Sequence, residues 1–90
     1  MKNIEQLRHF LIQSFPDTHI YLFGSRARGN ATPYSDVDIA IESNYSIRNK
    51  LSHARFMIEE SLIPYKVDLV DLSKAPYLKK MIEKEGVQWL

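Results

Sequence analysis

The chain has 90 residues, and with 44% hydrophobic residues, a net charge of +1 and no cysteine it has the composition of a folded soluble domain. This length supports one hydrophobic core, so we expect a single domain over residues 1–90. The composition excludes disulfide and zinc–thiolate sites and gives no reason to expect direct binding to nucleic acid. Because the sequence shows neither a signal peptide nor a membrane-spanning run, a cytoplasmic protein is expected.

The N-terminal segment is predicted to be an amphipathic helix that ends near Pro16. Asn3 and Gln6 can form a variant of the capping box at its start. The short apolar run at residues 19–23 then predicts a strand. Apolar side chains recur at helical spacing before that strand, namely at Ile4, Leu7, Leu11 and Phe15.

A glycine turn follows the first strand. Gly24 and Ser25 end the apolar run, and the segment from Arg26 to Arg28 can form a short helical turn before Gly29. Exposed main-chain N–H groups at such a turn, together with the Ser25 hydroxyl, make an anion-binding site. A plain turn without a ligand is the alternative interpretation.

The second predicted strand carries two aspartates one residue apart. In an extended chain Asp36 and Asp38 project from one face, while Val37, Ile39 and Ile41 project from the other. Two carboxylates this close raise each other's pKa unless a cation lies between them, which points to a divalent metal. A solvated strand face is the alternative.

A long amphipathic helix is predicted between residues 46 and 62, with Ser46 as its N-cap. Phe56 and Met57 lie partly off its apolar stripe, so they either add to the core, which we favour, or contact a partner. In the loop before the second strand, Tyr34 either stacks on a base or packs on its neighbours.

The third predicted strand, residues 65–72, contains a further carboxylate. Alternation places Asp68 with Val70 on one face and Leu69 on the other. An aspartate in the middle of a buried strand requires a partner or a metal, so Asp68 is the candidate third carboxylate. Asp71 is the competitor, because an acidic residue also has an ordinary role near a helix N-terminus.

The C-terminal part is predicted to form a helix over residues 74–85 that stops at Gly86. Residues 87–90 form a short apolar tail. Its Trp89 either covers the core or contacts another subunit.

The combination of GSRARG with SDVDIAI resembles the nucleotidyltransferase fold of the DNA polymerase beta superfamily, most closely its minimal nucleotidyltransferase domains. The resemblance runs from about Ile20 to Asp71. It implies an α/β (α+β) fold, with a small mixed β-sheet packed against helices.

The resemblance also implies the chemistry, which is magnesium-dependent transfer of a nucleoside monophosphate from ATP or another NTP to a hydroxyl group. In that family the Gly-Ser turn holds nucleotide phosphate, and two strand aspartates with a third on a later strand hold two magnesium ions. Carried onto this sequence, the catalytic and metal-binding residues are Asp36, Asp38 and Asp68, and the nucleotide-binding residues are Gly24, Ser25, Arg26 and Arg28.

Minimal domains of this family commonly act as antitoxins with a separate helical HEPN protein as the toxin, and they adenylylate a tyrosine on it. The resemblance therefore implies a HEPN-type partner and transfer of AMP to it. Two alternatives stay open at this stage. One is an antitoxin that binds its partner without catalysis, and the other is a transferase whose small-molecule acceptor is bound by another subunit.

Overall fold

The computed structural model describes residues 1–32 and 35–90, so the roles considered for Tyr34 lie outside the described residues. Its sheet has four strands in the order β3-β2-β1-β4. β1 is antiparallel to both of its neighbours, whereas β2 and β3 are parallel. This mixed sheet confirms the predicted α/β (α+β) class. The strands are β1 (His19–Phe23), β2 (Val37–Glu42), β3 (Val67–Asp71) and β4 (Val87–Gln88).

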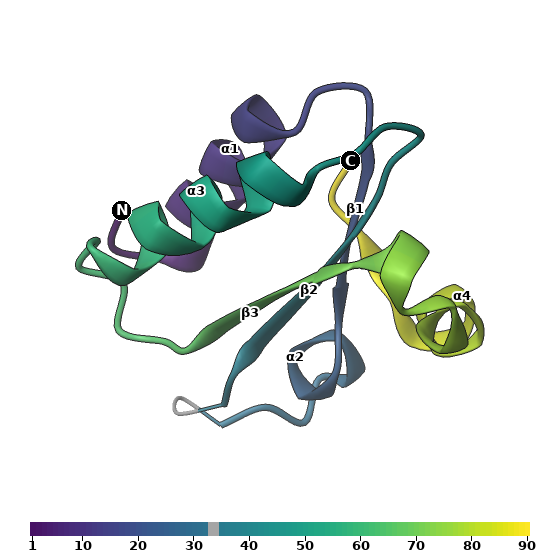
Figure 1. Ribbon diagram of the computed structural model, residues 1–90. Helices are drawn as coiled ribbons and strands as arrows, with labels where there is room; N and C mark the ends of the chain where they lie inside the picture. The colour runs from purple at the N-terminus through teal and green to yellow at the C-terminus, as the bar shows by residue number, and fades with distance from the viewer. Residues whose placement is uncertain (33–34) are drawn as a thin grey trace.

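Helices lie on both sides of the sheet (Figure 1). α1 (Ile4–Ser14) and α3 (Arg48–Glu59) cover one face, and α4 (Lys79–Glu85) packs on the other. The short α2 (Ser25–Arg28) directly follows β1. Within residues 1–32 and 35–90, no helix has the length and apolar character needed to cross a membrane.

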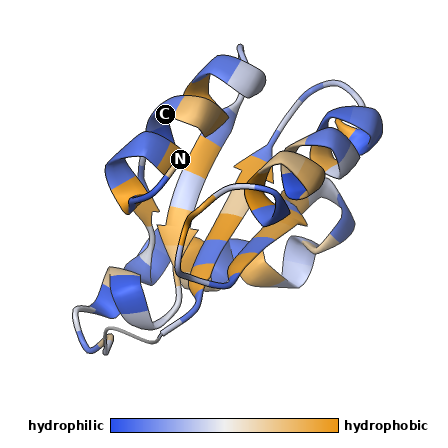
Figure 2. Cartoon of the chain, turned by 90° about the vertical axis from the view of Figure 1, so that its left-hand side faces the viewer, coloured by the Kyte–Doolittle hydropathy of each residue, from blue (hydrophilic) through white to orange (hydrophobic). Residues whose placement is uncertain are grey.

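The two faces of the sheet carry separate apolar clusters, because successive side chains of a strand point to opposite faces. Ile39 points into the larger cluster with α1 and α3, while its neighbour Ala40 belongs to the smaller cluster under α4. Orange, apolar residues recur along the strands in Figure 2, between blue and white ones. The larger cluster includes the predicted residues Leu7, Leu11, Phe15, Val37, Ile39 and Ile41.

The predicted cap of α1 is confirmed. The side chain of Asn3 accepts a hydrogen bond from the Gln6 N–H at 2.9 Å, and the Gln6 side chain accepts one from the Lys2 N–H at 2.7 Å. The helix ends at Ser14, and Phe15 at its C-cap is fully buried. Burial of Phe15 therefore holds the end of α1 in place ahead of β1.

α3 differs from its prediction at both ends. Ile47 stands at the N-cap without a side-chain hydrogen bond, so the prediction of Ser46 as N-cap was wrong. Ile47 is 1% exposed, so burial of its side chain anchors this end. The helix stops at Glu59, and Leu62 beyond it is 73% exposed.

The core assignment of Phe56 and Met57 was also wrong, because these side chains are 57% and 41% exposed. The buried stripe of α3 runs through Ala54 and Ile58. Phe56 lies two residues from each of them, which is about half a turn around the helix. It therefore faces away from the sheet.

The segment predicted as one helix over residues 74–85 is broken. Two short 3₁₀ turns, Leu72–Lys74 and Pro76–Leu78, precede α4. Pro76 lacks an N–H, and Ala75 before it adopts the non-helical φ −134° and ψ 57°.

The apolar tail contains a strand that the sequence analysis missed. β4 pairs Val87 with Leu22 on β1, and the Trp89 N–H donates to the Ile20 carbonyl at 2.7 Å. Trp89 is half-buried and packs against the larger core cluster, so it covers the core. Pairing with β1 explains why so short a strand is stable here.

Candidate active site

The main chain at Gly24 lies against the side chain of Asp38. Gly24 follows β1 with φ 79° and ψ −156°, a conformation that is essentially restricted to glycine. A Cβ atom built at this position would collide with the Asp38 carboxylate. The antiparallel register explains the approach, because Phe23 at the end of β1 pairs with Asp38 on β2.

The Gly24–Ser25 turn has the geometry of an anion site. The Gly24 carbonyl accepts hydrogen bonds from the N–H groups of Ala27 at 3.1 Å and Arg28 at 3.2 Å, which close the single turn of α2. The N–H groups of Ser25 and Arg26 stand in the first turn, where no helical carbonyl can accept them. Within residues 1–32 and 35–90 no main-chain carbonyl outside the helix accepts them, so they and the Ser25 hydroxyl are candidate donors to an anion.

Beside this turn, the charges of Asp36 and Asp68 both act on the carboxylate of Asp38. Asp38 and Asp68 are partners in the parallel register of β2 and β3, and Asp36 comes directly before β2. The pKa of Asp38 is raised, first by burial and then by the charges of Asp68 and Asp36. Lys66 and Arg28 oppose this increase but do not cancel it. A negatively charged cluster therefore surrounds Asp38.

Asp36, Asp38 and Asp68 are the candidate ligands of a hard divalent cation. Carboxylate oxygens are the ligands that magnesium prefers in proteins. A cation would offset both causes of the raised pKa of Asp38, which are burial and then the charges of Asp68 and Asp36. Among the described residues no three acidic or histidine side chains lie close enough together to hold a metal.

Asp71, the competitor of Asp68, makes different contacts. Its carboxylate accepts hydrogen bonds from the Ser73 N–H at 3.0 Å and the Ser73 hydroxyl at 2.7 Å, at the start of a 3₁₀ turn. In the register it pairs with Ile41 rather than with an aspartate. The structure thus places Asp68, and not Asp71, beside Asp38.

Arg26 connects the segments that carry the site. Its Nε and Nη2 atoms donate to the Ser35 carbonyl at 3.3 and 3.0 Å. Its guanidinium carbon lies 4.6 Å from the ring centroid of Tyr65. Arg26 therefore links α2 to the residue before Asp36 and to the start of the segment that leads to Asp68.

The side chain of Arg28 makes fewer contacts than that of Arg26. Its Nη1 atom lies 3.4 Å from a carboxylate oxygen of Glu85, and 42% of the Arg28 side chain is exposed. An exposed pair of this kind is easily exchanged for another anion. Because its charge also acts on Asp38, Arg28 lies within reach of the site.

Two residues of this region, Lys66 and Tyr65, were not predicted from the sequence. Lys66 opposes the increase in the pKa of Asp38, and Tyr65 stacks on Arg26. Strand alternation could have predicted the position of Lys66, because Lys66 stands two residues before Asp68 and therefore lies on the same face of the strand. No pattern in the neighbouring sequence predicts the contact of Tyr65 with Arg26.

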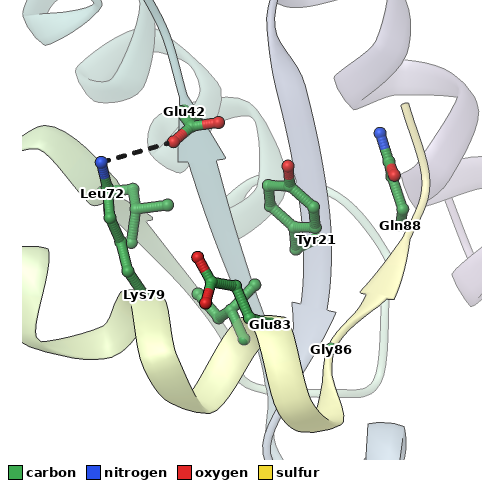
Figure 3. A pocket seen from close by; sticks show the side chains of 8 residues that line it. Tyr21, Glu42, Leu72, Lys79, Glu83, Gly86 and Gln88 are labelled. Carbon is green, nitrogen blue, oxygen red and sulfur yellow. Dashed lines mark ion pairs between the residues drawn. The ribbon is translucent and has the colours of Figure 1, made fainter.

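A separate cavity of about 340 Å³ lies between α4 and the sheet (Figure 3). Lys79 and Glu83 on α4 face Glu42 and Tyr21 on the strands, and the Lys79 ammonium lies 3.7 Å from the Glu42 carboxylate. Burial raises the pKa of the Tyr21 phenol, and Glu42 and Glu83 add to this effect. None of the predicted site residues lines this cavity.

Comparison with known proteins settles the family. The chain matches the nucleotidyltransferase domain family over residues 4–89. It belongs to that family. This nucleotidyltransferase domain is 39% identical over 69 residues to the probable protein adenylyltransferase MntA of Haemophilus influenzae. The alignment covers 72% of this chain and 58% of the Haemophilus protein, which is therefore considerably longer than the shared part.

Solved structures show the same fold. A chain in the crystal structure of a toxin–antitoxin with AMP-PNP superposes on this nucleotidyltransferase domain with a TM-score of 0.77 and 28% identity, covering 98% of this chain and 73% of that one. A chain in the structure of the tri-AMPylated Shewanella oneidensis HEPN toxin in complex with MNT antitoxin superposes with a TM-score of 0.66 and 25% identity. This match covers 96% of this chain and 71% of the other. These matches confirm the resemblance inferred from the two sequence motifs.

Proposed function

We propose that this nucleotidyltransferase domain transfers AMP from ATP, with magnesium, to a tyrosine hydroxyl of a HEPN-type toxin and so acts as its antitoxin. In this reaction the hydroxyl loses its proton to solvent and its oxygen forms a bond to the α-phosphorus, while the bond between the α-phosphorus and the bridging oxygen breaks and pyrophosphate leaves. The observation that carries the proposal is the contact of Gly24 with Asp38, because it joins an anion-binding turn to a carboxylate cluster.

Each part of the site has a role in this proposal. Asp36, Asp38 and Asp68 hold the magnesium ions, which supply activation of the attacking oxygen and neutralise charge on the triphosphate. The main chain at Gly24 and Ser25, with the Ser25 hydroxyl, holds the β- and γ-phosphates.

The two arginines are assigned different tasks. Arg28 can turn from Glu85 toward the leaving pyrophosphate, because its present ion pair is exposed. The contacts of Arg26 with Ser35 and Tyr65 favour a positioning role over the direct phosphate contact predicted from the sequence.

The named relatives support the choice of acceptor. The Haemophilus relative is a probable protein adenylyltransferase, and the Shewanella complex contains an AMPylated HEPN toxin. The exposed Phe56 and Met57 on α3 are candidates for contact with such a toxin, whereas Trp89 is engaged with the core.

The test is co-expression with the protein of the neighbouring reading frame, followed by intact-mass measurement of both chains. The partner should gain multiples of one AMP mass with wild-type protein, and none with the variants Asp36→Asn and Asp38→Asn. A matched control is Asp17→Asn, an exposed aspartate outside the site.

Two other outcomes of this experiment would support the two alternative functions. Co-purification without any mass shift in the presence of ATP and magnesium would indicate an antitoxin that acts by binding alone. A partner that stays unmodified while a small molecule in the lysate becomes labelled by ATP would indicate a small-molecule acceptor bound by another subunit.

A further inference from the structure

A groove runs between α3 and the open edge of β3. In the part of the chain that the structure describes, β3 pairs only with β2, and Figure 1 shows α3 running above its free edge. Two cavities of about 440 and 390 Å³ adjoin at Arg55 and Leu69, which line both, and the hydrogen bond between these two residues separates them. The second cavity reaches Lys66 and Asp68, beside the candidate active site.

The main chain at this edge is arranged to pair with another strand. The Lys66 carbonyl accepts a hydrogen bond from the Val37 N–H at 2.9 Å, so it points toward β2. Because these groups alternate along a strand, those of Val67, Leu69 and Asp71 point into the groove. The Leu69 carbonyl already accepts a hydrogen bond there, from Nη2 of Arg55 at 2.7 Å. A side chain thus covers the edge in the way that natural edge strands are protected.

The first cavity is basic. Arg48 and Arg55 from α3 and Lys74 from the 3₁₀ turn line it, against one carboxylate, that of Asp71. Asp71 already accepts two hydrogen bonds from Ser73. Within residues 1–32 and 35–90, no ion pair involves any of the three cations. Their charge is therefore available to an anionic occupant.

We propose that this groove binds an extended acidic segment of a protein partner, which adds a strand to β3. The segment would replace Arg55 at the Leu69 carbonyl and place acidic side chains against Arg48, Arg55 and Lys74. The alternating N–H and C=O groups of the edge match a polypeptide main chain, which a nucleic acid does not offer. A partner segment held in this way lies beside Asp68 and could bring an acceptor hydroxyl to the candidate active site. Only this delivery of the hydroxyl rests on the proposed function.

Binding can be tested without nucleotide or magnesium, and therefore independently of transfer. A short fluorescein-labelled peptide of alternating glutamate and valine is titrated with the full chain at low salt, with fluorescence anisotropy as the readout. The same peptide with lysine in place of glutamate, and a thymidine oligonucleotide, are the comparison probes. Hydrogen exchange of the Val67 and Leu69 amides reports strand pairing directly.

Charge reversal locates the site. The double variant Arg48→Glu, Lys74→Glu should weaken binding of the acidic peptide by about tenfold, the effect of losing two partly exposed charge pairs. Lys80→Glu, an exposed lysine on α4, should leave binding unchanged. Slower exchange at Val67 and Leu69 with the acidic peptide is the expected result.

The proposal is overturned if the acidic peptide fails to bind or binds no better than the lysine peptide. It is also overturned if charge reversal leaves the affinity unchanged or exchange at Val67 and Leu69 does not slow. Tighter binding of the oligonucleotide would reassign the groove to nucleic acid.

Discussion

The main chain of Gly24 is packed against the carboxylate of Asp38, so closely that no side chain fits between them. The two residues belong to different motifs and meet because β1 and β2 pair in antiparallel register. The Gly-Ser turn and the aspartate strand therefore form one surface. Each motif can be perturbed separately, which makes the proposed site testable.

Gly24→Ala should abolish nucleotidyl transfer and lower the melting temperature. The added Cβ meets the Asp38 carboxylate, and the backbone conformation is strained for any other residue. Gly29→Ala is the matched control, because Gly29 also has φ 79° but, its chain neighbours aside, no atom of residues 1–32 and 35–90 lies within 4 Å of its added Cβ. It should lose only about 1–2 kcal/mol of stability from strain and keep its activity. Equal activity of the two variants would contradict the proposed geometry.

Asp68→Asn should lower activity more than about a hundredfold, since even residues that only orient metal ligands typically contribute ten- to a hundredfold. Asp71→Asn should have little effect, because an asparagine oxygen can still accept the hydrogen bonds from Ser73. Both variants are compared in one adenylylation assay with the co-expressed partner. The opposite ranking would make Asp71 the third ligand.

Asp38→Asn should stabilise the metal-free protein at neutral pH. Because the pKa of Asp38 is raised in the folded state, the folded chain binds more protons than the unfolded chain, and stability falls as the pH rises through that range. Below the unfolded pKa of about 3.9 the carboxyl is protonated in both states, so the benefit of the substitution vanishes there.

Urea unfolding in EDTA at neutral and acidic pH measures this difference. Glu60→Gln, at an exposed position, is the control for general charge loss. Added magnesium should stabilise the wild type and not Asp38→Asn. A variant that is less stable than the wild type at neutral pH in EDTA would contradict the proposed repulsion.

Arg26→Lys should lower kcat about tenfold while leaving the KM for ATP nearly unchanged, because a lysine cannot make both hydrogen bonds to Ser35 and stack on Tyr65. Tyr65→Leu should show the same pattern if Arg26 acts by positioning. Arg28→Ala, in contrast, should raise the KM for ATP. An increase in KM with Arg26→Lys as large as that with Arg28→Ala would indicate direct phosphate contact by Arg26.

The sequence by itself determined the local features of this protein. Helical spacing and the Asn3 cap predicted α1, and period-two alternation placed Val37 and Ile39 in the core with Asp38 on the opposite face. These predictions succeeded because each depends on residues that are neighbours in the chain. The GSRARG and SDVDIAI motifs were enough to indicate the family that the comparisons then showed.

Only the tertiary structure decided how the separate segments meet. The parallel register that sets Asp68 beside Asp38 joins strands connected through α3, and no local periodicity encodes it. The same holds for β4, a two-residue strand that is defined by its pairing with β1. Arg26 reaches Ser35 and Tyr65 for a related reason, since long side chains find their partners only after the backbone around them has packed.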